Sequence, residues 1–269
     1  MRLSLSQIST ANASFDEDLL AYRAAGFDGI GLWEYKLSGD YVADRDALHG
    51  AQLEVTNCVP LVPTILPNPV MEGPEDLDAR IDSLRASIFR FAELRPASVL
   101  CLTGPVGSYG EAEARRIVIE GLQAIDEAAA ECGVRFGLEP IHRSQREEFS
   151  FVHTLPEALE LLADAGLEDV GVMVDTFHLG DTDDVLADLE RHVDRVTGLH
   201  VAEHPPDGRD GRVLPGEGTS PAAEVVQTLR GAVWDGWVDV EIFSTPDGFW
   251  GLEPGEAARR AYAADEGLL

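Results

Sequence analysis

Short runs of strand-forming residues alternate along this chain with longer segments of helical period, and the alternation repeats eight times. The runs are rich in Val, Ile and Leu, which is typical of strands that are covered on both faces. They span residues 3–8, 29–35, 53–59, 98–102, 135–139, 171–175, 197–203 and 237–243. Strands that alternate with helices favour a parallel sheet with crossover helices. Eight such units predict an α/β fold of the (β/α)₈, or TIM-barrel, type.

Several of the helical segments have recognisable ends. Residues with a hydroxyl group that can cap the first turn of a helix precede three of them, namely Ser14, Thr154 and Ser220. Glycines that can end the same helices stand at Gly26, Gly166 and Gly231. These signals place helices where the barrel needs them.

The stretch 59–76, after the third strand, contains too many prolines for a helix. It predicts a long loop at the carboxyl end of the barrel. Such a loop forms a lid or substrate wall, or it is an inert surface loop that tolerates insertions.

The size of the chain and its charge limit what it can be. Its 269 residues match the roughly 250 residues of one barrel, so we expect a single TIM-barrel domain over 1–269. Forty-nine acidic residues against twenty basic ones give a formal charge of −29, which would repel nucleic-acid phosphates and anionic lipids. There is no amino-terminal signal core and no stretch of about 18 apolar residues. We therefore predict a cytoplasmic protein with neither a nucleic-acid nor a membrane partner.

Four successive strand candidates carry a side chain that can bind a metal ion at or near their carboxyl ends. These side chains are Glu139, Asp175, His200 and Glu241. The carboxyl ends of parallel strands in a barrel meet around one point, and carboxylates in apolar strands are costly to bury unless they are paired or bound to a metal. Three oxygen donors and one imidazole suit one divalent ion, Mn²⁺ above all, or else Mg²⁺, Co²⁺ or Zn²⁺.

Several motifs in the second half of the chain occur in an order and spacing known from one family. They are GLEP (137–140), VGVMVDTFH (170–178), GLHVAE (198–203), VLPGEGT (213–219) and VDVEIF (238–243), preceded by FDGIGLWEYKL (27–37). From Phe136 to Leu252 the sequence resembles the xylose isomerase-like barrels. Within them it is most similar to the inosose (2-keto-myo-inositol) isomerase branch of the sugar phosphate isomerase/epimerase group. The resemblance implies that the same four residues are the metal ligands.

One position departs from a pattern within this group. Ketose 3-epimerases usually have a glutamate in an Asn-Arg-x-Glu arrangement shortly after the first metal ligand. This chain has His142, Arg143, Ser144 and Gln145 there, which counts against a ketohexose epimerase.

Further polar residues follow the predicted ligands in their loops. The resemblance implies that His178, three residues after Asp175, binds substrate hydroxyls or the metal-bound oxygen; the alternative is a histidine satisfied within its own loop. His142 and Arg143 follow Glu139 and are candidates for an acid or base and for a hydroxyl clamp, or else for ordinary surface pairing.

Other residues near the strand ends are expected to line the substrate pocket. Aromatic faces suit the C–H faces of a sugar or cyclitol as well as they suit core packing. The candidates for substrate contact are Trp33, Glu34, Phe177 and Trp250.

The predicted activity is metal-dependent isomerisation or epimerisation of a small polyhydroxylated carbonyl compound through an enediol. Glu139 and Glu241, approaching from different strands, would move the proton next to the carbonyl. His142 and His178 are the other candidates for this proton transfer. The chain would act alone or as a homo-oligomer.

Three alternatives remain open from the sequence. The first is a lyase of the same fold, a dehydratase or a C-glycoside-cleaving enzyme that eliminates from a keto-sugar, for which a second subunit is a candidate partner. The second is an endonuclease IV-like DNA repair enzyme, against which the negative charge and the seven histidines argue. The third is a sugar-binding barrel without catalysis.

Overall fold

The computed structural model describes residues 1–269 and consists of a closed barrel of eight parallel strands in sequence order. The strands are β1 (Arg2–Ser6), β2 (Gly29–Trp33), β3 (Glu54–Val59), β4 (Ser98–Cys101), β5 (Phe136–Leu138), β6 (Gly171–Asp175), β7 (Val196–Val201) and β8 (Trp237–Val240). β8 pairs with β1, Leu3 lying opposite Val238, and this pairing closes the barrel. All eight predicted strands are present, and the TIM-barrel prediction is confirmed.

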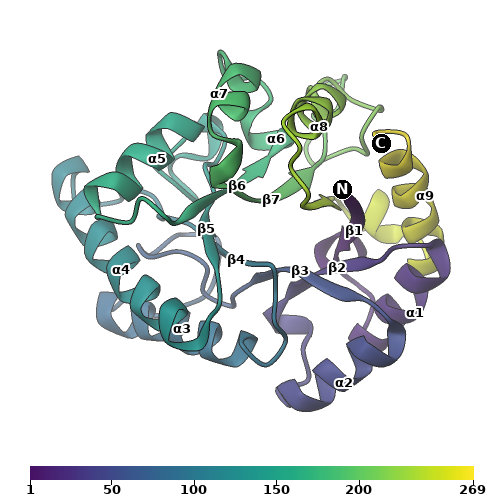
Figure 1. Ribbon diagram of the computed structural model, residues 1–269, viewed down its shortest axis with the longest axis horizontal. Coiled ribbons are helices and arrows are strands. Elements are labelled where there is room, and N and C mark those ends of the chain that lie inside the picture. The colour runs from purple at the N-terminus through teal and green to yellow at the C-terminus, as the bar shows by residue number, and fades with distance from the viewer.

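Helices surround the barrel on its outside (Figure 1). They are α1 (Phe15–Ala25), α2 (Tyr41–Ala51), α3 (Leu77–Phe91), α4 (Glu111–Cys132), α5 (Leu155–Asp164), α6 (Thr176–Leu179), α7 (Val185–Arg191), α8 (Ala222–Gly231) and α9 (Pro254–Glu266). Short 3-10 turns are η1 (Gln7–Thr10), η2 (Glu34–Lys36), η3 (Arg143–Gln145), η4 (Val193–Arg195) and η5 (Phe249–Gly251). None of the helices is long and apolar enough to cross a membrane.

The buried apolar residues form two separate clusters. The larger contains 54 residues and joins strand side chains such as Leu5 and Ile30 to helix side chains such as Tyr22. The smaller contains six residues at the carboxyl ends of the strands and in the segments that follow them, namely Ile8, Trp33, Val59, Leu100, Leu102 and Ile141. The first cluster holds the helices on the barrel. The second lies beside the pocket described below.

The helix caps at Ser14 and Thr154 are present as predicted. Ser14 forms a complete capping box, because its hydroxyl accepts from the backbone of Glu17 and the Glu17 carboxylate accepts from the backbone of Ser14. Thr154 caps α5 in the same way, accepting from the backbone N–H of Glu157 at 3.2 Å. Each cap satisfies an N–H group that the helix itself leaves free.

The prediction for Ser220 was wrong. α8 begins one residue later than expected, after Pro221, and the Ser220 hydroxyl instead accepts from the backbone N–H of His204. This hydroxyl therefore ties the loop after β7 to the start of α8. A hydroxyl before a helical segment indicates a cap only when no other N–H group reaches it first.

Two of the three glycines act as predicted at helix ends. Gly26 and Gly166 adopt left-handed backbone conformations, with φ of 111° and 72°. Gly231 does not, because it is the last residue of α8 and the chain turns at Val233, which has φ of 63°.

The single lysine of the chain is buried, which its sequence context does not indicate. Lys36 Nζ lies 2.6 Å from an Asp18 carboxylate oxygen, and both side chains are excluded from solvent. Lys36 also donates to the backbone oxygens of Gln7 and Thr10. This pair joins η2 to α1 and η1 outside the pocket.

Candidate metal and substrate site

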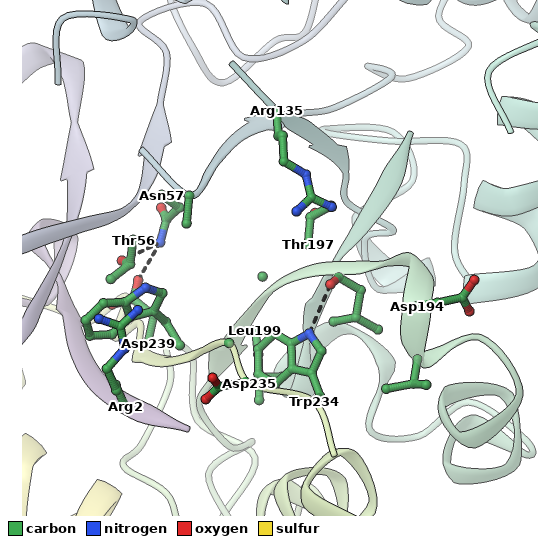
Figure 2. Close-up of a pocket in the computed structure, with 16 residues that line it drawn as sticks. Arg2, Thr56, Asn57, Arg135, Asp194, Thr197, Leu199, Trp234, Asp235 and Asp239 are labelled. Carbon is green, nitrogen blue, oxygen red and sulfur yellow. Dashed lines mark hydrogen bonds between the residues drawn. The ribbon is translucent and has the colours of Figure 1, made fainter. Parts of the chain in front are cut away.

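Cavities open at both ends of the barrel. The cavity at the amino end has a volume of about 370 Å³ and is bordered by Asn57, Arg135, Thr197 and Asp239 among others (Figure 2). Its polar groups do not converge on one point. The Asn57 amide donates to Asp239 Oδ2 at 2.8 Å, while Asn57 Oδ1, Asp239 Oδ1 and Thr197 Oγ1 are buried without a partner.

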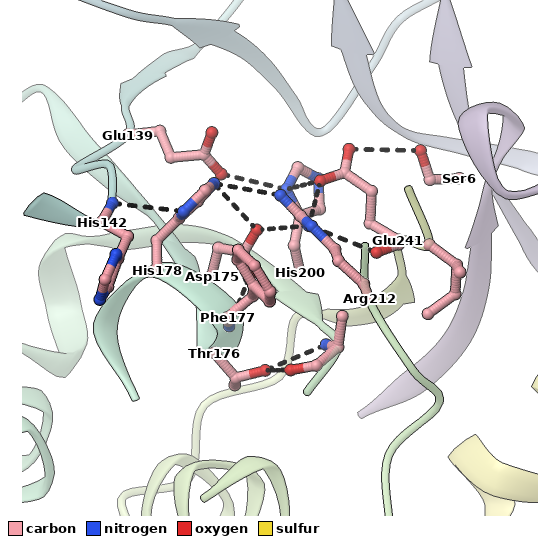
Figure 3. A network of polar contacts seen from close by, with 12 residues as sticks. Ser6, Glu139, His142, Asp175, Thr176, Phe177, His178, His200, Arg212 and Glu241 are labelled. Atoms are coloured by element: carbon pink, nitrogen blue, oxygen red, sulfur yellow. Dashed lines mark hydrogen bonds and ion pairs between the residues drawn. The ribbon is translucent and has the colours of Figure 1, made fainter. Parts of the chain in front are cut away.

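The cavity at the carboxyl end has a volume of about 330 Å³ and contains converging charges. Three carboxylates, two imidazoles and one guanidinium form a continuous network there (Figure 3). In a TIM barrel the carboxyl end is where active sites lie. This cavity is therefore the candidate site.

Glu139, Asp175 and His200 form the centre of the site. Each offers one ligand atom, these atoms lie within 4.8 Å of one another, and all three residues are buried. Asp175 and His200 are direct partners in the pairing of β6 with β7, so the barrel register brings them to the same depth. Glu139 follows β5, and its Oε1 lies 3.1 Å from His200 Nδ1.

Glu241, the fourth predicted ligand, adjoins this centre. Its Oε2 lies 3.5 Å from His200 Nδ1, and its Oε1 accepts from the Ser6 hydroxyl, also at 3.5 Å. The residue is buried just beyond the end of β8. Glu139 and Glu241 thus approach the same imidazole nitrogen from two different strands.

Arg212 completes the network, and sequence reasoning missed it. Its Nη1 lies 2.8 Å from Asp175 Oδ2 and 2.9 Å from Glu241 Oε2. Arg212 itself is only 9% exposed. Its guanidinium lies 4.7 Å from the ring centroids of both Phe177 and Phe243. No local pattern marks this arginine, because it stands in a long irregular segment between β7 and α8.

Burial and neighbouring charges shift the protonation of this network. Burial raises the pKa of Glu139 to about 7, although the His200 ring acts in the opposite direction. Burial alone would lower the pKa of His200, but the carboxylates of Glu241 and Glu139 outweigh it and raise that pKa to about 10. Burial also opposes ionisation of Asp175, yet Arg212 and the nearby imidazoles hold the pKa of Asp175 below its usual value.

The donor set fits a divalent cation. Three buried carboxylates lie beside one permanent cation, Arg212, so negative charge is in excess when the three are ionised and His200 is neutral. Buried charge without compensation is costly, and the pKa of His200 is raised because its proton supplies part of the missing positive charge. Carboxylate oxygens with one imidazole are ligands that Mn²⁺, Mg²⁺, Co²⁺ and Zn²⁺ all accept. The set can therefore hold a metal ion.

His178 lies at the edge of the network, as its position after Asp175 predicts. Its Nε2 lies 3.1 Å from Arg212 Nη2 and 3.7 Å from Asp175 Oδ2, and its Nδ1 lies 3.3 Å from the backbone nitrogen of His142. Burial lowers the pKa of His178 to about 3. Its imidazole is therefore uncharged and borders the pocket.

The side chains of His142 and Arg143 lie outside the pocket, which agrees with the interpretation of surface pairing and not with substrate contact. His142 Nε2 lies 2.9 Å from an Asp181 oxygen, and exposed Arg143 lies 3.6 Å from Glu157. Both border a separate cavity. The reason is the 3-10 turn η3, which begins at Arg143 and carries the chain away from the barrel axis.

Glu34 also lies outside the pocket, against expectation. Its carboxylate accepts from Arg90, Tyr41, Ser87 and the backbone of Leu61. Although burial acts to raise it, these hydrogen bonds lower the pKa of Glu34. The 3-10 turn η2 begins at this residue, so its side chain points to α3 and joins elements outside the barrel.

The aromatic candidates divide into two groups. Trp33 and Phe177 border the pocket, and the Phe177 ring stacks on His204 with centroids 3.9 Å apart. Trp250 packs behind the pocket against the smaller apolar cluster, its Nε1 donating to the backbone oxygens of Ile8 and Ile242. Trp250 therefore supports the wall and does not form it.

The proline-rich loop contributes to the pocket. It contains no helix before α3, as predicted, and its backbone continues alongside β4 through the hydrogen bonds from Ile65 and Leu66 to Leu102 and Thr103. Pro63, Val70 and Met71 of this loop border the cavity. Of the two interpretations of the loop, the substrate wall agrees with this position.

Asp239 stands behind His200, on the side of the amino-end cavity. Its Oδ2 lies 3.7 Å from His200 Nε2, which has no hydrogen-bond partner. Sequence reasoning missed this residue, although strand alternation places residues 239 and 241 on the same face of a strand. The two nitrogens of the His200 ring thus lie beside different groups. Nδ1 faces the carboxylates of Glu139 and Glu241, and Nε2 faces Asp239.

A site of this composition at the carboxyl end of a closed parallel barrel defines a metal-binding TIM-barrel protein. The chain from residue 19 to residue 264 matches the family described as xylose isomerase-like TIM barrel. It belongs to this family, as the motifs between Phe136 and Leu252 predict.

The relatives of this chain include sugar epimerases and isomerases. A D-psicose 3-epimerase from Enterocloster bolteae is 31% identical over 140 residues, which cover 52% of this chain and 44% of that protein. An inosose isomerase from Halalkalibacterium halodurans is 28% identical over 139 residues, which cover 49% of this chain and 48% of that protein. The matched stretches span less than half the length of these relatives.

The fold is shared with solved structures of low sequence identity. The IOLI protein with a bound zinc atom has a TM-score of 0.83 to this chain, covering 100% of it and 98% of its own length at 18% identity. At 18% identity this similarity concerns the arrangement of the helices and strands alone.

Proposed function

We propose that this protein is a divalent-metal-dependent isomerase or epimerase that acts on a sugar or cyclitol, by proton transfer at the carbon next to a carbonyl group. The observation that carries the proposal is the position of Glu139 and Glu241 on either side of His200 Nδ1, at 3.1 and 3.5 Å. The named activities of the relatives, an epimerase and an isomerase of polyhydroxylated ketones, support the same class of reaction.

The proposed metal ligands are Glu139, Asp175, His200 and Glu241, with Mn²⁺ as the foremost candidate ion. These four residues would hold the ion, which would supply a Lewis acid for the substrate carbonyl and for the negative charge on its oxygen. Glu139 and Glu241 reach the substrate from β5 and β8, and each can remove or return a proton at the carbon beside the carbonyl. Two proton carriers that follow different strands suit an epimerisation, in which the proton returns to the other face of the same substrate carbon. They also suit an isomerisation, in which it returns to a different substrate carbon.

Other residues orient these groups and the substrate. Arg212 holds one oxygen each of Asp175 and Glu241, which fixes the orientation of both carboxylates. His178, kept neutral by burial, is suited to hydrogen-bond a substrate hydroxyl. The apolar walls around the charged floor exclude water and so strengthen the electrostatic interactions within the pocket.

A lyase of the same fold remains the second candidate, because removal of the same proton starts a β-elimination. His142 would be an attractive acid or base for that reaction, but its ring pairs with Asp181 outside the pocket. This position favours isomerisation over elimination. Gln145, in place of the glutamate typical of ketose 3-epimerases, counts against a ketohexose 3-epimerase.

Chelation provides the first test. Extended dialysis against a chelator should abolish turnover of inosose and keto-sugars, and addition of Mn²⁺, Mg²⁺, Co²⁺ or Zn²⁺ should restore it. Full activity in protein shown to be metal-free would refute the proposal. Product analysis on keto-sugars with and without a leaving group then distinguishes an isomerase from a lyase.

Solvent deuterium provides the second test. Glu241→Gln should reduce deuterium exchange into the substrate by about 10²–10⁴-fold, the usual contribution of a positioned acid or base, while substrate binding changes far less. Glu139→Gln is the paired variant, and each must retain metal at a saturating concentration. Undiminished exchange in both metal-loaded variants would exclude these carboxylates as proton carriers and leave His178 as the candidate.

A further inference from the structure

The rim of the pocket is divided into a charged half and an apolar half. The charged side chains belong to β5–β8 and the segments after them, and they form the floor of the pocket. The opposite half, from β2–β4 and the proline-rich loop, consists of Trp33, Val59, Pro63, Met71, Leu100 and Leu102. Ten of the seventeen residues that line the pocket are hydrophobic, and Pro63 adds a further apolar side chain. A substrate bound to the floor must place its remaining atoms against the apolar half.

Although aromatic faces suit the C–H faces of a sugar, the hydroxyl groups of a bare polyol would lack hydrogen-bond partners in this apolar half. Each of its hydroxyl groups that is buried without a partner costs about 1–3 kcal/mol. Apart from His178 at the edge of the charged network, the pocket offers one uncharged polar side chain, Gln145, whose Oε1 is buried and has no hydrogen-bond partner. One amide satisfies one or two hydroxyl groups, and the other hydroxyls of a free sugar on that side would meet carbon.

The pocket also offers aromatic surface, from Trp33 in the apolar half and from three phenylalanines in the segments after β5, β6 and β8. Phe149, Phe177 and Phe243 border the cavity together with Trp33, and the rings of Trp33 and Phe243 lie edge to face with centroids 5.6 Å apart. Aromatic walls bind flat rings through stacked or edge-to-face contacts. A volume of about 330 Å³ lies at the lower end of the range of about 300–1,000 Å³ that is typical of small-molecule pockets.

We propose that the substrate carries an aryl group, so that its hydroxy-carbonyl part binds the charged floor and the aryl group lies against the wall formed by Trp33, Met71, Leu100 and Phe149. The substrate class is thus a keto-sugar or keto-cyclitol with an aromatic substituent. Gln145 binds a hydroxyl group between the two parts. This inference rests on the proposed function, because it takes the floor as the site of the metal and the carbonyl group.

Two metal-chelating probes test the apolar wall separately from the chemistry. Acetohydroxamate and 3-phenylpropanohydroxamate share the chelating group, and only the second carries an aryl group. Calorimetric titration of Mn²⁺-loaded protein should show binding of the aryl probe about 10- to 100-fold tighter, the gain expected for burying one phenyl ring after ordering costs.

Variants of the wall sharpen the test. Phe149→Gln and Met71→Gln should each lower the preference for the aryl probe by about 3- to 10-fold, with little effect on acetohydroxamate. Phe149→Leu, which keeps the wall apolar, should retain most of the preference. Phe89→Gln, which changes an exposed phenylalanine on α3, is the matched control and should change neither affinity.

The outcomes separate this inference from the proposed function. Equal affinity for the two probes, or a preference that the wall variants leave unchanged, would overturn the aryl wall while the metal site stands. No binding of either probe to Mn²⁺-loaded protein would overturn the proposed function and the inference with it. In the supporting case, solvent deuterium exchange should also be faster, by at least about 10-fold in kcat/KM, for a keto-glucoside with a phenyl group than for the free keto-sugar.

Discussion

At the carboxyl end of the barrel, the buried carboxylates of Asp175 and Glu241 are held by Arg212, and that of Glu139 contacts His200. On α9, close to Asp239 of the amino-end cavity, the Asp265 carboxyl group is buried with neither a hydrogen bond nor an ion pair. Burial raises the pKa of Asp265 well above its usual value, and the nearby Asp239 raises it further. The two ends thus treat buried acid groups in opposite ways.

The cavities themselves do not reveal this difference. They have similar volumes, about 330 Å³ at the carboxyl end and 370 Å³ at the amino end. At the carboxyl end several charged groups converge within hydrogen-bonding distance, whereas at the amino end single acceptors face the cavity alone. Convergence of charge, and not volume, identifies the functional end. The comparison also predicts that substitutions at the two ends change different properties.

The largest effect is expected at the metal centre. Asp175→Asn and His200→Ala should each lose bound metal and, with it, turnover, because each removes a ligand at the centre of the set. The far-ultraviolet circular-dichroism spectrum should remain that of the folded barrel. Metal content by mass spectrometry, measured beside the spectrum, checks this, with the exposed Asp183→Asn as control. Variants that unfold in the presence of metal would instead assign these residues a structural role.

The next largest effect concerns Arg212. Arg212→Met should lower the free energy of unfolding of the metal-free protein by about 3–5 kcal/mol, because it leaves Asp175 and Glu241 buried without their cation. The loss should be smaller in the metal-loaded protein, in which the ion supplies positive charge. Urea denaturation with and without Mn²⁺ measures both values.

The exposed Arg209 in the same loop provides the control for this experiment. Arg209→Met should leave both free energies within about 0.5 kcal/mol of their original values. An equal loss for Arg212→Met with and without metal would show that the arginine and the ion do not share the carboxylates.

A moderate effect on metal affinity is expected from Asp239, which lies between the two ends of the barrel. Asp239 is the carboxylate nearest to His200 Nε2, and a histidine that binds a metal usually donates its other N–H group to such a partner. Asp239→Asn should therefore weaken metal binding by about 10- to 100-fold. Thr197→Val, in the same amino-end cavity, should leave the metal affinity unchanged. Unchanged affinity in Asp239→Asn would show that the two ends are independent.

The smallest effect over a single pH unit is expected at Asp265. Because its pKa is raised in the folded protein, the folded state keeps a proton that the unfolded chain loses above about pH 4. Its contribution to stability therefore falls as the pH rises through the folded pKa. Asp265→Asn should remove this fall, which amounts to about 1.4 kcal/mol per pH unit wherever only the folded state is protonated.

Denaturation curves between about pH 5 and pH 8 measure this difference. Glu266→Gln, an exposed neighbour on α9, is the control and should keep the original slope. A slope that Asp265→Asn leaves unaltered would mean that this carboxyl group titrates normally in the folded protein.

Local sequence was sufficient for the barrel. Eight apolar runs with helical segments between them predict the strands, because the hydrophobic period and the turn residues act over a few neighbouring positions. Because these signals act only over a few neighbouring positions, some helix ends were predicted wrongly. Ser220 and Gly231 have the right residue types, but the positions of His204 and Val233 decide how they are used.

The sequence also determined which residues meet at the floor of the pocket. Parallel strands bring their carboxyl ends together, so Glu139, Asp175, His200 and Glu241 could be grouped before any coordinates were known. The same reasoning could have identified Asp239, because Asp239 and Glu241 lie on the same face of a strand.

Only the tertiary structure decided the partners of these residues. Glu34 ends a strand just as Glu139 does, yet the 3-10 turn that begins at Glu34 turns its carboxylate toward Arg90. Arg212 comes from an irregular loop and reaches Asp175, 37 positions earlier in the chain. Loop conformations depend on contacts between distant segments, and no short-range period in the sequence encodes such contacts.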